Sequence, residues 1–302
     1  MSNILENKEY EFLNKFNLCY VCYGGSYAYG TNNENSDIDI RGVYTEDVND
    51  IVSVYDNSKE VYVDNKTDTV VYSLKKFLTL VVGMNPNIIE MLGVREEDIL
   101  YANAIGKYMH DNVEMFLSKK AFFTFNGYAL SQLGRLKNAL NYNGVSISEK
   151  KNKLYNEYIK QYGSVFFYED KIDLDIRDMP IDLAFDMIND IRSSLRNKSV
   201  GHRNNKKTED KLNKHAMHLL RLFYMGIDIL EKGEVNTYRY NEREMLLAIR
   251  KGEVSMEEVF KKTAELEERM KNAYRNSTLP DVIDKKIIND FYRKAMFDKS
   301  NL

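Results

Sequence analysis

The residues best suited to chemistry in this 302-residue chain are two aspartates placed one residue apart, Asp37 and Asp39. They stand in the run SDIDIRGVY, in which Ile38 and Ile40 alternate with polar residues as in a β-strand. Residues two apart on a strand share a face, so we expect both carboxylates to project together while the isoleucines enter the core. Two adjacent anions need a cation, and hard divalent ions with oxygen ligands fit best. The pair therefore predicts a site for two Mg²⁺ ions, with Mn²⁺ as a substitute.

A glycine–serine turn comes a short polar spacer before the aspartates. Gly24 and Gly25 follow the apolar run LCYVCY, and Ser26 opens the next turn or helix. Backbone N–H groups and a hydroxyl at such a position suit a phosphate group. We therefore expect Gly25 and Ser26 to hold the phosphate tail of a nucleoside triphosphate (NTP), whose metal ions Asp37 and Asp39 hold.

Taken alone, the two aspartates could lie on an exposed edge strand and the glycines in a plain turn. The joint pattern is more specific, and it resembles the nucleotidyltransferase superfamily, which has the DNA polymerase β-like fold. The stretches GGSYAYGTNNENSDIDIRGVY, TVVYSLKKFLTLVVGMNPNIIEML, KHAMHLLRL and GEVNTYR extend this likeness over most of the chain. They resemble a branch of predicted nucleotidyltransferases that has been linked to RNA repair by its association with RNA ligases.

The resemblance implies a third carboxylate, on a neighbouring strand, that helps ligate one metal ion near the attacking hydroxyl. Asp68, at the start of DTVVYSL, is the first candidate, followed by Asp64 and then Glu60. An ordinary aspartate in a hairpin turn is an equally good interpretation of Asp68. Arg41 shares the expected strand face of the pair and could contact a phosphate, although a structural ion pair fits as well.

Further cationic side chains follow one helical pattern, TEDKLNKHAMHLLRLFYMGIDIL, which Thr208 should cap. If this cationic face is directed at the active site, its side chains would bind phosphates. The alternative is a solvated helix face without a ligand. A His-x-x-His metal site is less favoured, because no third ligand is evident. The basic loop 199–207 could meet nucleic acid, and one of several tyrosines near the glycine turn could stack on a base. The candidate phosphate contacts on the helix are Lys214, His215, His218 and Arg221, and the tyrosines are Tyr23, Tyr27, Tyr29 and Tyr72.

The order of patterns along the chain predicts an α+β fold. Strands are expected at 18–23, 37–44, 60–64 and 68–74, with short helices at 4–17, 75–82 and 88–93, the last capped by Asn87. Long helical patterns follow at 119–143, 148–163, 180–195, 208–231, 241–251 and 255–275. With the resemblance, this order predicts a nucleotidyltransferase (DNA polymerase β-like) N-terminal domain with a mixed sheet, residues 1–105. An all-helical C-terminal domain, residues 106–302, should close the active site and contribute phosphate and acceptor contacts.

Composition limits the class of protein further. The net charge of −3 argues against a general polyanion binder, although local basic patches stay possible. Cys19 and Cys22 form a CxxC inside an expected strand, without the second ligand pair that a zinc site needs, and are expected to be buried strand residues. No apolar run is long enough to cross a membrane, and a cytoplasmic protein is expected. The oligomeric state stays open.

The expected reaction is transfer of a nucleoside monophosphate (NMP) from an NTP to a hydroxyl, with release of pyrophosphate. An RNA end, such as that of a tRNA, is the first candidate acceptor. The same chemistry on a protein hydroxyl, as in AMPylating or toxin-like enzymes, or on a small molecule is the alternative. A non-catalytic nucleotide- or RNA-binding module is the alternative from another class, and it would not need to retain the metal carboxylates.

Overall fold

The computed structural model describes residues 6–34, 36–54, 59–141, 165–168, 171–174 and 209–297. The chain folds as two compact units: Met1–Leu133 with Asn213–Leu302, and Gly134–Leu212. No boundary between these units falls after residue 105, which lies inside the first unit. The assignment of separate roles to residues 1–105 and 106–302 stays a prediction.

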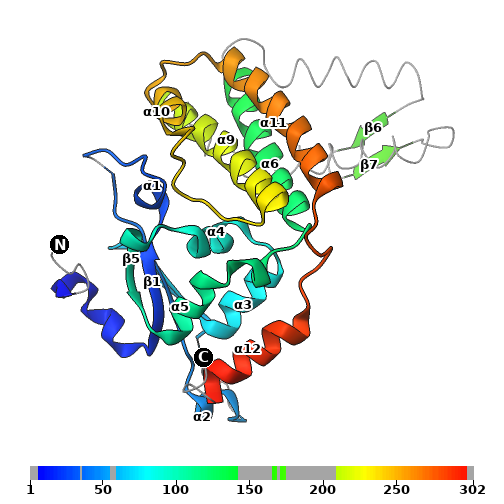
Figure 1. The fold of residues 1–302 in the computed structure, drawn as a ribbon. Helices are drawn as coiled ribbons and strands as arrows, with labels where there is room; N and C mark the ends of the chain where they lie inside the picture. Colours follow the sequence, from blue (N-terminus) through cyan, green and yellow to red (C-terminus); the bar gives the residue numbers. More distant parts are fainter. Residues whose placement is uncertain are drawn as a thin grey trace. The chain divides into compact units, whose positions relative to one another are not determined.

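A mixed five-stranded sheet forms the centre of the N-terminal region, as the sequence predicts (Figure 1). Its strand order is β3-β4-β2-β1-β5, in which β2 and β4 are parallel and the other neighbours antiparallel. The hairpin of β3 and β4 is confirmed, whereas β5 was not expected from the sequence. The strands are β1 (Leu18–Tyr23), β2 (Ile40–Tyr44), β3 (Val61–Asp64), β4 (Thr69–Ser73) and β5 (Ile99–Ala102).

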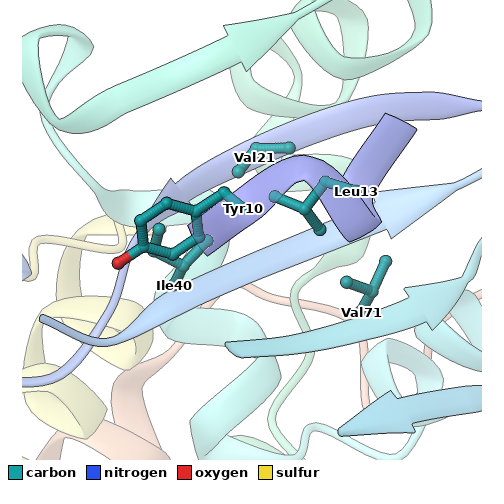
Figure 2. Packing of buried hydrophobic residues seen from close by; sticks show 5 residues of the cluster. All are labelled: Tyr10, Leu13, Val21, Ile40 and Val71. Atoms are coloured by element: carbon teal, nitrogen blue, oxygen red, sulfur yellow. The ribbon is translucent and has the colours of Figure 1, made fainter. Parts of the chain in front are cut away.

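The N-terminal helix covers one face of this sheet. It is a 3₁₀ helix, η2 (Lys8–Lys15), in place of the expected α-helix, and the Asn7 side chain caps it. Figure 2 shows Tyr10 and Leu13 of η2 with Val21, Ile40 and Val71, which come from three neighbouring strands. These buried apolar contacts fix strand β2, at whose start the aspartates lie.

The two cysteines lie on strand β1 and belong to its buried part. Both side chains are fully buried, and they are not joined in a disulfide. Burial raises the pKa of the Cys22 thiol strongly, which keeps that thiol protonated. The expected role of Cys19 and Cys22 as buried strand residues is confirmed.

Short helices connect the strands, and polar side chains define where several of them begin. The Ser73 hydroxyl accepts a hydrogen bond from the backbone of Lys76 and so caps α3. The helix that starts with Pro86 is capped by Asn85, whose side chain accepts a hydrogen bond from the backbone of Asn87, so Asn87 lies inside this helix and is not its cap. These elements are α1 (Gly25–Ala28), α2 (Val48–Ile51), α3 (Leu74–Val82), α4 (Pro86–Ile89), η3 (Glu90–Gly93), η4 (Glu96–Asp98), α5 (Ala104–Asp111) and η5 (Val113–Phe116).

The described C-terminal part is largely helical, as expected (Figure 1), and most side chains of α9 from Leu212 to Leu230 are buried. Gly226 of α9 lets Phe125 and Met270 approach closely, and Arg269 pairs with Glu231 at 2.6 Å. Neighbouring helices α6 and α11 therefore pack directly on α9. The helices are α6 (Ala121–Asn141), α9 (Glu209–Lys232), α10 (Arg243–Lys251), α11 (Met256–Asn276) and α12 (Lys285–Phe297).

Some expected elements fall on residues outside the described ranges. These are the helices at 148–163 and 180–195, the basic loop 199–207 and the capping residue Thr208. Between them an antiparallel pair is described, β6 (Val165–Tyr168) and β7 (Lys171–Leu174). No helix in the described ranges has both the length and the apolar content needed to cross a bilayer.

Candidate active site

The two aspartates lie just before strand β2, and not inside it as the sequence pattern suggested. Strand β2 begins at Ile40, which is fully buried, while Ile38 is only partly buried. Asp37 is exposed and Asp39 is half-buried. The two carboxylates therefore stand in different environments, because the strand pairing that would put them on one face starts after Asp39.

The glycine turn and Asp39 are in direct contact. Gly25 has a φ of +52°, a left-handed conformation that favours glycine. A Cβ built on Gly25 would overlap the carboxylate of Asp39, and the backbone N–H of Gly24 donates to the Asp39 carbonyl at 2.8 Å. Helix α1 starts at Gly25, so Ser26 lies in its first turn. The local fold thus brings the candidate phosphate turn directly against a candidate metal ligand.

The parallel pairing of β2 and β4 brings Asp68 beside Asp39. Ile40 is paired with Thr69, so the two aspartates precede equivalent positions on neighbouring strands. The backbone N–H of Ile40 donates to the Asp68 carbonyl at 3.3 Å. Burial raises the pKa of the Asp39 carboxyl; Arg41 opposes this shift, and the charge of Asp68 adds to it. The carboxylates of Asp39 and Asp68 are therefore close enough for their charges to interact at the start of β2 and β4.

The other two candidates for the third carboxylate have structural partners. The Asp64 carboxylate accepts hydrogen bonds from the backbone and hydroxyl of Thr67, at 3.1 and 2.8 Å, and so stabilises the hairpin turn. Glu60 pairs with Lys76 at 2.8 Å. Asp68 is accordingly the candidate whose position suits a shared site with Asp39.

Arg41 binds the two strands together at this point. One guanidinium nitrogen lies 3.1 Å from Asp39 Oδ1, and the other donates to the carbonyls of Ile40 and Asp68 at 2.9 and 2.7 Å. This is the structural ion pair that the sequence left as one of two possibilities. The guanidinium is partly exposed, so it can still meet a bound phosphate.

The oxygen donors fit a hard divalent cation, although they do not form a complete protein cage. Within the described ranges, no three His, Cys, Asp or Glu side chains are gathered closely enough to hold a metal ion. Mg²⁺ is usually bound by one or two carboxylates together with substrate phosphates and water. Asp39 and Asp68, at neighbouring strand ends, match that mode of binding, and Asp37 lies exposed just before them.

The N-terminal half of α9 brings cations toward this region. Lys214 is exposed and lies near enough to Asp39 to lower the pKa of that carboxyl. Farther along the helix, Arg221 is buried, 7% exposed, and its guanidinium carbon lies 3.3 Å from the ring centre of Tyr29. The cationic side chains of α9 therefore differ in exposure: Lys214 is exposed to solvent, whereas Arg221 is buried. They do not form one evenly exposed face, as their spacing in the sequence suggested.

Glu90 is a partly buried carboxylate of this region that could not be singled out from the sequence. It accepts a hydrogen bond from the Tyr29 hydroxyl, and Arg221 lies 3.8 Å away. Burial raises the pKa of Glu90, whereas Arg221 and the Tyr29 hydrogen bond lower it. The run NPNIIEML indicates only a short helix, so no local signal separates Glu90 from a surface residue.

The family model of RlaP, described as the RNA repair pathway DNA polymerase beta family, matches residues 3–294. The chain belongs to this family. Searches of curated proteins and of solved structures find no match. Membership in the RlaP family supports the DNA polymerase β-like α+β fold and indicates a nucleotidyltransferase of the RNA repair branch.

In this RlaP family member the cationic set extends from α9 to α10. His218 is half-buried, and burial with the charges of Arg221, Lys214, His215 and Arg250 lowers its pKa to about 2. The atoms Nε and Nη1 of Arg221 and Nη1 of Arg250 are buried without a hydrogen-bond partner in the part of the chain that is described. Arg250 was not singled out from the sequence, because a helical pattern does not tell which neighbouring helix its residues face.

The four candidate tyrosines near the site have separate roles. Tyr23 and Tyr27 are partly buried and stack on each other with ring centres 5.5 Å apart. Tyr29 is buried and serves packing, and Tyr72 is half-buried on β4. Only Tyr23, Tyr27 and Tyr72 of these four keep exposed surface that could contact a base.

The lowered pKa of His218 predicts a pH dependence of stability. In the unfolded chain this imidazole binds a proton below about pH 6.5, whereas in the folded protein it stays neutral. The unfolded state therefore binds more protons, and the free energy of unfolding falls as the pH drops below about 6.5. Between pH 7 and pH 5 we expect His218 to account for a loss of about 1–2 kcal/mol.

Urea denaturation of wild type and His218→Gln at both pH values measures this contribution. The variant should lose about 1–2 kcal/mol less than wild type over this range. The variant His110→Gln is the control, because the His110 ring lies beside the Asp111 carboxylate, at 3.6 Å, and beside the Val94 carbonyl oxygen, at 3.0 Å. Equal losses in wild type and His218→Gln would contradict the neutral state of His218.

Proposed function

We propose that this protein transfers a nucleoside monophosphate from an NTP to a hydroxyl at an RNA end, such as that of a tRNA, and releases pyrophosphate. The observation that carries the proposal is the contact of Asp39 with Gly25, next to Asp68 on the neighbouring parallel strand. A phosphate-binding turn and two carboxylates at one point of a sheet suit metal-assisted phosphoryl transfer. The RlaP family match over residues 3–294 agrees with this chemistry.

In the proposed site Asp37, Asp39 and Asp68 hold divalent metal, Mg²⁺ first and Mn²⁺ as a substitute. When bound, such ions neutralise the charge that develops on the phosphate oxygens. The N–H groups of the Gly25 turn and the Ser26 hydroxyl hold the triphosphate tail. Arg41 lies at the same strand ends and supplies a further positive charge.

The reaction is an in-line displacement at the α-phosphorus. The acceptor oxygen forms a bond to that phosphorus while the bond to the β-phosphate oxygen breaks, and pyrophosphate leaves. The acceptor hydroxyl gives up its proton, and Asp68 is the proposed nearby carboxylate that receives it. Lys214, His215, His218 and Arg221, with Arg250 from the next helix, would contact phosphates of the nucleotide or of the acceptor.

The acceptor is tested by offering several classes at once. Purified protein is incubated with each of the four NTPs, labelled at the α-phosphate, with Mg²⁺ or Mn²⁺. Total RNA, tRNA and cell-lysate protein are supplied in separate reactions. We expect label in RNA, and none with the double variant Asp37→Ala, Asp39→Ala. Label only in protein would move the proposal to AMPylation-like chemistry, and nucleotide binding without transfer would favour a non-catalytic module.

A further inference from the structure

We propose that Arg243 and Tyr238, which lie far along the chain from the glycine turn, position that turn (residues 24–30). They belong to the connection between helices α9 and α10, residues 233–242, and to the first residue of α10. Neither residue is assigned to a catalytic role. The expected effect on NTP binding rests on the proposed function. The expected effect on the conformation of the turn does not.

Both residues contact the last residue of the turn, Gly30. Arg243 Nε donates to the Gly30 carbonyl oxygen at 2.7 Å. Gly30 has a φ of +65°, and a Cβ at this position would overlap the ring of Tyr238. Glycine is therefore required at position 30 for two reasons: its φ is left-handed, and a side chain would overlap the Tyr238 ring.

The connection that carries Tyr238 is itself firmly held. The backbone and hydroxyl of Thr237 both donate to the Gly93 carbonyl, at 3.1 and 2.9 Å. Arg239 forms a buried ion pair with Asp228 of α9. The guanidinium of Arg95 lies over the Tyr238 ring, 3.9 Å from its centre. The Tyr238 ring thus presents a fixed surface to Gly30.

The glycine turn needs tertiary contacts to keep its conformation. Helix α1 has four residues, and a single helical turn is unstable without tertiary contacts. Its end is held on one side by Tyr29, which bonds to Glu90 and lies under Arg221. Arg243 and Tyr238 hold the next residue, Gly30. The two contacts together fix the direction of the N–H groups at Gly25 and Ser26.

The first test is hydrogen exchange of the amides in residues 24–31, which needs no activity. Arg243→Ala should speed their exchange about tenfold, because the partly buried hydrogen bond from Arg243 to the Gly30 carbonyl is lost. Arg243→Lys, which can still donate to the Gly30 carbonyl, should restore part of the protection. Arg269→Ala is the matched control, because it removes an exposed arginine pair between α9 and α11 and should leave these amides unchanged.

The second test is the kinetics of NMP transfer. Arg243→Ala should raise KM for the NTP about 5- to 20-fold with a smaller change in kcat, while Arg269→Ala keeps both near wild type. Gly30→Ala, which displaces Tyr238 from the other side, should act in the same direction. Unchanged exchange in both Arg243→Ala and Gly30→Ala would overturn the positioning role, and faster exchange with unchanged KM would overturn its link to the reaction. A wild-type protein without transfer activity would refute the proposed function. The hydrogen-exchange data would still show whether Arg243 and Tyr238 position the glycine turn.

Discussion

Asp39→Asn is expected to lower the rate of NMP transfer about 10³-fold, because a metal ligand at the transferring phosphate contributes several kcal/mol and about 1.4 kcal/mol is a factor of ten. Asparagine keeps the shape of the side chain and can still accept the hydrogen bond from Arg41, which lies 3.1 Å from Asp39 Oδ1. The free energy of unfolding should therefore change little. Steady-state rates with saturating Mg²⁺ and NTP, together with a thermal melt, measure both quantities.

Asp68 and Asp64 provide a matched pair for the same experiment. Both stand at the β3–β4 hairpin, but only Asp68 lies beside Asp39, whereas Asp64 bonds to Thr67. Asp68→Asn should cost about 10²-fold or more in kcat. Asp64→Asn retains an acceptor for Thr67 and should keep near-wild-type activity. The reverse order of effects would reassign the third carboxylate to Asp64.

Gly25→Ala is expected to reduce transfer about 10²-fold while the protein stays folded. Two causes act together: the left-handed φ of +52° is strained for alanine, and the new methyl group would overlap the Asp39 carboxylate. The displaced carboxylate and the altered turn should weaken both the metal site and the hold on the phosphates. Rates at several Mg²⁺ concentrations should show a higher metal requirement.

Gly127→Ala is the control for this glycine substitution. Gly127 lies in helix α6, and a Cβ there would meet no atom within 4 Å. We expect unchanged kinetics and a gain in stability of up to about 1 kcal/mol, as for alanine in place of glycine inside a helix. If Gly25→Ala behaved like Gly127→Ala, the close approach of Gly25 and Asp39 would have no part in the reaction.

The local parts of the candidate site were predictable from the sequence. The Gly-Ser turn, the Asp-x-Asp pair and the buried strand of Ile40 are close in sequence, so side-chain periodicity and turn chemistry describe them. The start of β2 was misplaced by three residues because periodicity does not show where pairing with a neighbouring strand begins. Asp37 is therefore more exposed than the alternating pattern implied.

The pairings between distant segments were not predictable in this way. The place of Asp68 depends on the parallel register of β2 with β4, which the hairpin pattern of β3 and β4 does not fix. Glu90 and the connection at 233–242 gain their partners only when α9 and α10 pack near the sheet, and Arg250 comes near His218 in the same way. A single sequence carries no local signal for such pairings, since each of these residues alone looks like a solvated polar residue.

The measurement that tests the central claim most directly compares two labels in the same NTP. RNA is incubated with Mg²⁺, the protein and an NTP labelled either at the α- or at the γ-phosphate. The proposal predicts that the α-label enters RNA, that the γ-label is released in pyrophosphate, and that Asp39→Asn removes both signals. Entry of the γ-label into RNA, or α-labelling that persists in Asp39→Asn, would contradict NMP transfer at this site.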